Sequence, residues 1–125
     1  MKKISTDKAP AAIGPYSQAI EAGNFLFASG QIPINPATGN VEAQGITAQA
    51  EQSMKNVGEI LKAAGLTYDN VVKTTCYLAE IVDFAAFNEV YAKYFTQNPA
   101  RSCVAVKDLP KGVLCEVEVT AYREN

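Results

Sequence analysis

The apolar residues of this chain change their spacing several times, and this alternation constrains its fold more than any other feature. Two segments have helical spacing, and they begin at Thr47 and after Asp83, which we expect to act as N-caps. Gly65 is expected to end the first helix, and Asn98-Pro99 the second. Their apolar stripes contain Ala50, Met54, Val57, Leu61 and Ala64, and then Phe84, Phe87, Tyr91 and Phe95.

Between and around these helices, β-branched and aromatic residues predict strands. The first two strands flank Gly23-Asn24, a two-residue turn of the kind that closes a hairpin. The order of hairpin, helix, strand, helix and two strands predicts an α+β fold, with two helices packed on one face of a mixed sheet. The predicted strands cover residues 18–22, 25–29, 71–78, 102–106 and 113–122.

The chain has the size of one domain, and we expect residues 1–125 to form it, because no linker or low-complexity tract divides them. In the last predicted strand, residues 113, 115, 117, 119 and 121 form an apolar face and the alternate residues a mixed one. Two helices cover only one face of such a sheet. A partly apolar second face therefore indicates a homo-oligomer.

Charge and hydropathy disfavour several classes of function. A net charge of −2 provides no general attraction for phosphate backbones, so nucleic acid is an improbable partner. No apolar run is long enough to cross a membrane, and the N-terminal residues lack the apolar core of a signal peptide. We therefore expect a cytoplasmic protein that does not bind membranes.

The chain has 3 cysteines and no histidine, and this narrows the possible chemistry. The odd number and wide spacing of Cys76, Cys103 and Cys115 argue against a disulfide framework and a zinc site. Catalytic triads that contain histidine are excluded, so acid–base chemistry falls to Glu, Asp, Tyr, Cys, Lys or water. With no metal-ligand cluster or phosphate loop, we expect no metal and no cofactor.

The segment from Pro99 to Glu118 has the most informative candidate residues. Arg101 could anchor a carboxylate through paired hydrogen bonds, and Glu116 could activate water if burial raised its pKa. If the turn at residues 109–112 folds the two flanking strands together, these side chains lie beside one pocket. Position alone nevertheless favours solvated surface charges for both, and for Glu118 as well.

Other candidates have ordinary structural explanations. Cys103 has no histidine to stabilise its thiolate, so a small, buried residue is the better interpretation. Gly30 could let the backbone approach a ligand or could form a bulge or turn. Tyr16, in Gly14-Pro15-Tyr16-Ser17, could place a hydroxyl over a site or belong to an ordinary turn.

Several motifs, taken together and in order, resemble the RidA/YjgF family of reactive-intermediate deaminases over essentially the whole chain. The motifs are Ala9-Pro10-Ala11-Ala12-Ile13-Gly14-Pro15-Tyr16-Ser17-Gln18-Ala19, Ser29-Gly30-Gln31-Ile32-Pro33, Ala63-Ala64-Gly65-Leu66, Val72-Lys73-Thr74-Thr75, Pro99-Ala100-Arg101-Ser102-Cys103-Val104 and Leu109-Pro110-Lys111-Gly112. The resemblance implies a chorismate-mutase-like fold assembled as a homotrimer, with active sites between subunits. It also implies cofactor-free hydrolysis of 2-imino acids, or their enamine tautomers, to 2-oxo acids and ammonia.

The resemblance also assigns site residues. Arg101 would hold the substrate carboxylate, and Glu116, rather than Glu118, would orient the attacking water. Backbone groups around Gly30 and Cys103 would bind the reacting end of the substrate. The remaining implied pocket residues are Tyr16, Ser29 and Asn88.

The sequence departs from the family pattern at two places, and it is compatible with two other functions. The link at residues 96–98 is shorter than in many relatives and immediately precedes Arg101, so we expect it to affect the shape of the pocket and the preferred substrate more than the fold. Cys115 stands where an aliphatic residue is more usual in the family. A protein that binds small 2-oxo acids without turnover would need the same arginine. Endoribonuclease activity is disfavoured by the acidic composition and the absence of histidine.

Overall fold

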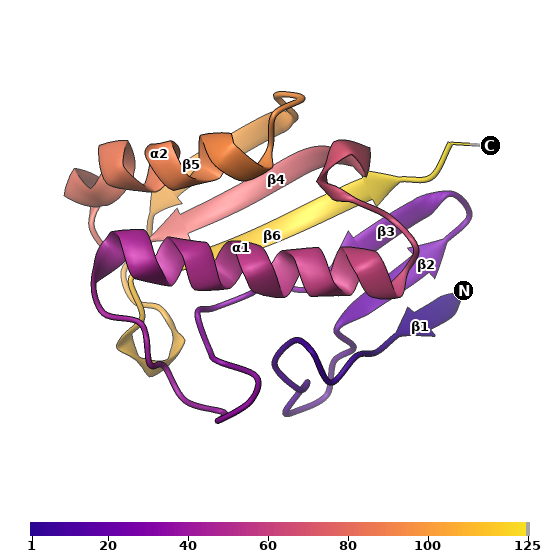
Figure 1. The fold of residues 1–125 in the computed structure, drawn as a ribbon, viewed down its shortest axis with the longest axis horizontal. Helices are drawn as coiled ribbons and strands as arrows, with labels where there is room; N and C mark the ends of the chain where they lie inside the picture. Colours follow the sequence, from indigo (N-terminus) through magenta and orange to yellow (C-terminus); the bar gives the residue numbers. More distant parts are fainter. Residues whose placement is uncertain (125) are drawn as a thin grey trace.

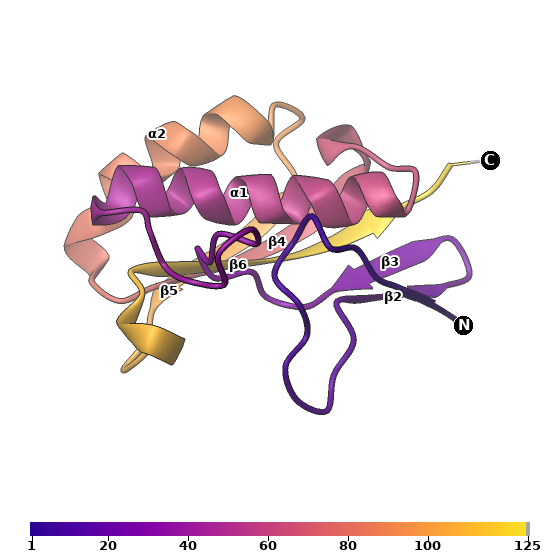
Figure 2. The same cartoon turned by 60° about the horizontal axis from the view of Figure 1, so that its bottom comes forward.

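Two helices cover one face of a six-stranded mixed sheet in the computed structural model, which describes residues 1–124 (Figure 1; Figure 2). This α+β arrangement is the one that the sequence predicts. The elements are β1 (Lys2–Ile4), β2 (Ala19–Ala22), β3 (Phe25–Ala28), α1 (Gly45–Ala63), β4 (Val71–Leu78), α2 (Phe84–Tyr94), β5 (Ala100–Ala105) and β6 (Cys115–Tyr122), with the 3₁₀ turns η1 (Tyr68–Asn70), η2 (Ile81–Asp83) and η3 (Pro110–Gly112).

The strand order is β1-β2-β3-β6-β4-β5, so β5 and β6 do not pair with each other. β4 lies between them, parallel to β5 and antiparallel to β6. The connection through α2 returns the chain in the same direction as β4, which accounts for the parallel pair. The turn at residues 109–112 therefore joins two strands on opposite sides of β4 rather than closing a hairpin.

Both helices and the five predicted strands are present, but β5 begins at Ala100 instead of residue 102, β6 begins at Cys115 instead of residue 113, and the helix ends also differ. α1 begins at Gly45, before Thr47, and Gln44 occupies the N-cap position. The earlier start lets Ile46 pack against the core. Asp83 is the N-cap of α2 by position, but its side chain makes no capping hydrogen bond, and the helix ends at Tyr94, before Asn98-Pro99. Strand β1 is too short to show a pattern, and it was not predicted.

Gly65 ends α1 as expected, because it adopts a left-handed φ of 75°. Its N–H donates to the carbonyl of Lys62 at 2.9 Å, and the N–H of Leu66 donates to that of Leu61 at 2.9 Å. These bonds satisfy carbonyls that the helix end would otherwise leave exposed.

The hydrophobic core lies between the sheet and the helices. On β6, alternate residues from Cys115 to Ala121 are fully buried against the helices, as the strand pattern predicts. Burial raises the pKa of the Cys76 and Cys115 thiols to about 12, which fits residues that serve packing. The helices contribute the buried side chains of Met54, Val57, Ile60, Leu61, Phe87 and Val90.

The other face of the sheet has no helix over it (Figure 2). Phe25 and Phe27 on β3 are 42% and 48% exposed, and the ring of Phe25 contacts that of Tyr122 at a centroid distance of 5.1 Å. Exposed aromatic rings side by side on a sheet are typical of a surface that another protein covers. Among residues 1–124, no helix is both long and apolar enough to span a membrane.

Candidate functional site

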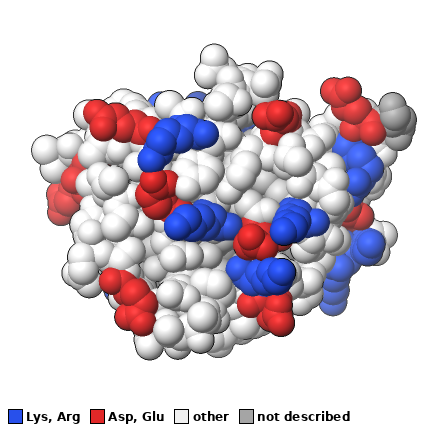
Figure 3. Space-filling view, viewed as in Figure 1, with Lys and Arg blue, Asp and Glu red and all other residues white. Residues whose placement is uncertain are grey.

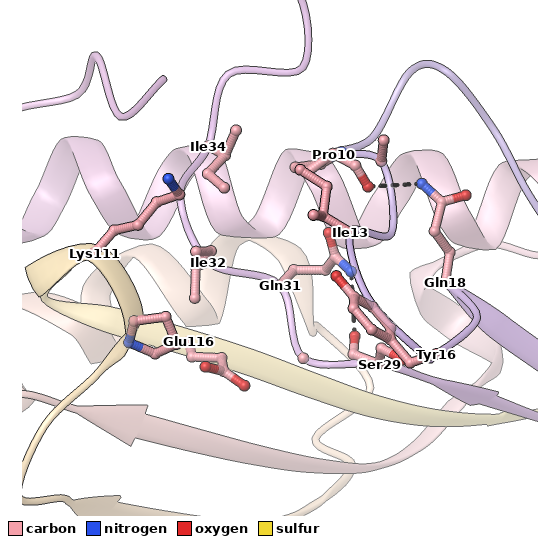
Figure 4. Close-up of a pocket in the computed structure, with 13 residues that line it drawn as sticks. Pro10, Ile13, Tyr16, Gln18, Ser29, Gln31, Ile32, Ile34, Lys111 and Glu116 are labelled. Carbon is pink, nitrogen blue, oxygen red and sulfur yellow. Dashed lines mark hydrogen bonds between the residues drawn. The ribbon is translucent and has the colours of Figure 1, made fainter. Parts of the chain in front are cut away.

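A cavity of about 550 Å³ opens beside Glu116, near the start of β6 (Figure 4). It lies between the N-terminal loop, the segment after β3 and the turn η3. Tyr16, Ser29, Gly30 and Glu116, four of the predicted site residues, line it. Segments far apart in the sequence therefore meet at one cavity. The remaining lining residues are Pro10, Ala11, Ile13, Gln18, Gln31, Ile32, Ile34, Pro110 and Lys111.

The Glu116 side chain packs directly over the backbone of Gly30. Any Cβ at this position would overlap with the Glu116 carboxylate. Hydrogen bonds on either side fix the approach, because the Gln31 N–H donates to the Val117 carbonyl at 2.8 Å and the Val117 N–H donates back at 3.1 Å. Gly30 thus allows its backbone to lie against the Glu116 side chain instead of against a ligand. This contact places the Glu116 carboxylate at the cavity wall.

The Glu116 carboxyl is half-buried, and its surroundings favour the protonated form. Burial raises its pKa above the usual value of 4.5, and the neighbouring Glu118 carboxylate raises it further. Glu118 is exposed, and its carboxylate accepts a hydrogen bond from the Tyr77 hydroxyl at 3.1 Å. Of the two glutamates, only Glu116 lines the cavity and is placed to hold or exchange a proton there.

Ser29 connects the cavity floor to the N-terminal loop. Its hydroxyl donates to the Ser17 carbonyl at 2.6 Å, and its N–H donates to the Gln18 carbonyl at 2.9 Å. The Gln18 side-chain amide donates in turn to the Pro10 carbonyl at 2.8 Å. These bonds hold the loop on which Tyr16, 53% exposed, stands at the mouth of the cavity (Figure 4).

The residue-by-residue prediction missed the apolar wall of this cavity and one cation at its edge. Ile13, Ile32 and Ile34 supply the wall, and Lys111 adopts a left-handed φ of 57° on η3. Ile13, Ile32 and Lys111 all lie inside the recognised motifs, and this position was the one indication in the sequence that they belong to the site.

Arg101 lies on the face of the sheet opposite to Glu116, where it contacts α2. Its Nη1 donates to the side-chain oxygen of Asn88 at 2.7 Å. Its guanidinium lies 4.7 Å from the ring centroid of Tyr91 and 5.5 Å from that of Phe84. A hollow of about 320 Å³ beside it is lined by Arg101, Asn88 and Pro99, together with Tyr91, Ala92, Phe95 and Asn98.

Cys103 follows Arg101 by two residues and shares its face of β5, as strand alternation predicts. It lies opposite Cys76 in the parallel pair and packs against the core. Burial raises the pKa of the Cys103 thiol, and the Arg101 guanidinium offsets part of that rise. The thiol is therefore a poor nucleophile at neutral pH, as the sequence predicts.

The predicted site residues thus form two groups on one chain. Glu116 alternates with the buried Cys115 and Val117 and so faces away from the helices, whereas Arg101 contacts α2. A single chain consequently does not place Arg101 beside Glu116, although each group borders its own concave surface. Within residues 1–124, no three side chains of the His, Cys, Asp or Glu type cluster as metal ligands would.

Together these features define a small α+β protein with a candidate site divided between the two faces of its sheet. The model of the Endoribonuclease L-PSP family matches residues 6–123. The chain belongs to this family, which includes the RidA and YjgF proteins, and the resemblance in the sequence motifs is thereby confirmed.

Curated relatives and solved structures match along the full length. The 2-iminobutanoate/2-iminopropanoate deaminase of Escherichia coli is 50% identical, and the alignment covers 98% of each chain. The crystal structure of the E. coli YjgF gene product is 48% identical with a TM-score of 0.94, covering 99% of this chain and 100% of that one. E. coli TdcF, solved with bound serine, is 44% identical with a TM-score of 0.94 at the same coverage.

Proposed function

We propose that this protein is a hydrolase that deaminates 2-imino acids, such as 2-iminobutanoate and 2-iminopropanoate, and their enamine tautomers. The observation that carries the proposal is the 50% identity, over 98% of both chains, to a protein named for this activity. The cavity beside Glu116 and the cation at Arg101 supply groups that suit the reaction. One domain, formed by residues 1–125, would hold all of them.

The proposed reaction adds water to the imine carbon and then breaks the carbon–nitrogen bond, releasing a 2-oxo acid and ammonia. A protonated imine is already electrophilic, so the protein chiefly has to fix the substrate and place a water. Arg101 would hold the carboxylate through paired hydrogen bonds. Glu116, with its raised pKa, would orient the water and exchange a proton with it.

The other predicted residues would complete the pocket. Backbone groups at Gly30 and Cys103 would hold the reacting end of the substrate, and the Tyr16 hydroxyl would reach it from the cavity mouth. Ser29 lines the cavity floor, and Asn88 lies beside Arg101. No step in this proposal requires a cofactor or metal.

We also propose that the active protein is a chorismate-mutase-like homotrimer whose sites form between subunits. Two observations support this assembly. Arg101 and Glu116 face opposite sides of the sheet in one chain, so a second copy could supply the missing half of each site. The uncovered sheet face, with exposed Phe25 and Phe27, offers an apolar surface for that copy.

An imine-hydrolysis assay tests the activity directly. The imine is generated in situ by a dehydratase or an amino-acid oxidase, and the release of ammonia and 2-oxo acid is followed with and without the protein. We expect acceleration over buffer by the wild type and a loss of about 1,000-fold in Arg101→Ala, because the carboxylate loses its anchor. No acceleration by a folded, oligomeric wild type would refute the proposal.

Mixing two inactive variants tests the assembly. Arg101→Ala and Glu116→Gln chains are unfolded together, refolded and assayed against each variant refolded alone. If one subunit supplies Arg101 and its neighbour supplies Glu116, random mixing restores about a quarter of the wild-type sites. If both residues serve a site within one chain, the mixture stays as inactive as its parts.

A second function, binding of small acids without turnover, is favoured by the TdcF structure, which contains bound serine. Tight binding of 2-oxobutanoate by a wild type that fails the imine assay would support it. Cleavage of RNA, suggested by the name of the family model, is disfavoured by the net charge of −2. Acidic and basic groups are also interspersed over the helix-bearing face, with no continuous basic patch there (Figure 3).

A further inference from the structure

Neutral groups alone hold the Arg101 guanidinium in the described chain. Its hydrogen-bond partner is the amide oxygen of Asn88 at 2.7 Å, and its flat faces lie near the aromatic rings of Tyr91 and Phe84. Within residues 1–124, ion pairs join Lys93 to Glu51 and Arg123 to Glu21, and neither includes Arg101. These contacts therefore hold the Arg101 guanidinium in place, and no carboxylate among them neutralises its positive charge.

Arg123 shows that the fold can hold an arginine in the opposite way. Its Nη2 contacts the Glu21 carboxylate at 2.5 Å and donates to the Ala64 carbonyl at 2.6 Å. That arginine is neutralised by a carboxylate while it caps the end of α1. A structural arginine in this protein thus has an acidic partner, whereas the arginine of the candidate site has an amide.

The neutral support of Arg101 is itself anchored in the core. The Tyr91 hydroxyl shares a hydrogen bond with the hydroxyl of Thr74 at 2.8 Å, and Thr74 is fully buried on β4. The ring that underlies the guanidinium is thereby fixed. Cation–π contact with this ring attracts the guanidinium but leaves its net charge unchanged.

We propose that Asn88 is a positioning residue that orients Arg101 while leaving its charge available to the substrate carboxylate. This inference rests on the proposed function, in which Arg101 binds that carboxylate. An aspartate at position 88 would keep the size, the helix position and the hydrogen bond. It would also place a negative charge on the guanidinium and compete with an anionic ligand.

Three variants, Asn88→Asp, Asn88→Ala and the control Gln97→Glu, separate charge from geometry. Gln97 is exposed on the link between α2 and β5 and does not line the hollow beside Arg101, so its change to glutamate repeats the amide-to-carboxylate substitution without replacing the hydrogen-bond partner of the guanidinium. The Kd for 2-oxobutanoate is measured by calorimetry, and KM and kcat are measured by imine hydrolysis. Thermal unfolding reports whether each variant folds.

We expect Asn88→Asp to raise the Kd about 30-fold or more, Asn88→Ala about threefold, and Gln97→Glu by less than about twofold. The loss in Asn88→Asp should fall on KM rather than kcat, with a Tm at or above that of the wild type. A purely structural role for Asn88 predicts the reverse order, because aspartate keeps the hydrogen bond and alanine removes it.

Binding by Asn88→Asp that equals the wild type, or exceeds that of Asn88→Ala, would overturn the inference while leaving the proposed function intact. Failure of the wild type to bind 2-oxobutanoate would instead overturn the role of Arg101 as a carboxylate anchor, and the inference with it. Binding without imine hydrolysis would refute only the catalytic step.

Discussion

The two halves of the candidate site are built in different ways. On the Glu116 side, the geometry rests on the backbone, because paired hydrogen bonds between Gln31 and Val117 bring Gly30 so close to Glu116 that an added Cβ would displace its carboxylate. On the Arg101 side, the geometry comes from side chains of α2 that surround a cation on the edge strand β5.

This difference indicates how each half should respond to substitution. A change on the Glu116 side acts through shape, since an added atom displaces the carboxylate from the cavity wall. A change on the Arg101 side acts through charge, since the helix offers neutral contacts to a guanidinium. Substitutions at Gly30, Cys103 and Glu116 distinguish these two kinds of response.

Gly30→Ala should lower kcat by about 100-fold while leaving the fold intact. The added methyl group would overlap with the Glu116 carboxylate, which ends a flexible side chain and can swing aside at little cost in stability. Misplacing the water-orienting group removes most of its contribution to the rate. Imine hydrolysis and thermal unfolding of the same preparation measure both quantities.

Gly58→Ala is the matched control, because its methyl group would overlap with the Tyr68 hydroxyl, and neither residue lines the cavity beside Glu116. That hydroxyl donates to the Met54 carbonyl at 2.7 Å, so its displacement should lower stability by about 1 kcal/mol and leave kcat unchanged. If Gly30→Ala lost stability but kept its activity, the contact between Gly30 and Glu116 would serve only packing, and the proposed role of Glu116 would be contradicted.

Cys103→Ser should change kcat/KM by no more than about threefold. Burial raises the pKa of this thiol, and the proposed reaction uses the backbone of Cys103 rather than its sulfur. Serine keeps the size and loses only the apolar contact with the core. A loss of 100-fold or more, with unchanged thermal unfolding, would indicate covalent chemistry and contradict the assignment.

Periodicity was sufficient to predict the layers of this fold. Both helices and the five longer strands follow from their apolar spacing and from turn residues such as Gly23, whose φ is 59°. The pairing of β5 with β4, rather than with β6, could not be predicted in this way, because a strand pattern states which face is buried and not which neighbour lies beside it.

The candidate site was less predictable from local patterns, because its contacts join distant parts of the sequence. Nothing near Gly30 indicates that Glu116 packs over it, and nothing near Asn88 indicates that Arg101 donates to it. The motif resemblance supplied these residues as a group. It could not state that Arg101 and Glu116 face opposite sides of the sheet, which required the buried face of β6 and the contact of Arg101 with α2.

Ionisation of Glu116 should change the thermal stability of the protein slightly as the pH changes. Because its pKa is raised in the folded protein, the folded state holds the Glu116 proton more tightly than the unfolded chain does. The folded state is therefore penalised as pH rises above the usual value of 4.5, and the penalty is absent at lower pH. Glu116→Gln removes this penalty, so its Tm should exceed that of the wild type by about 1–3 °C at pH 8.

The same comparison at pH 3.5 should show no difference between Glu116→Gln and the wild type, because both proteins are then uncharged at this position. Glu89→Gln, a substitution at an exposed carboxylate on α2, controls for the change in net charge. A gain in Tm that persists at pH 3.5 would come from packing instead. A loss of Tm at pH 8 would mean that the ionised carboxylate stabilises the folded state, and it would contradict the raised pKa of Glu116.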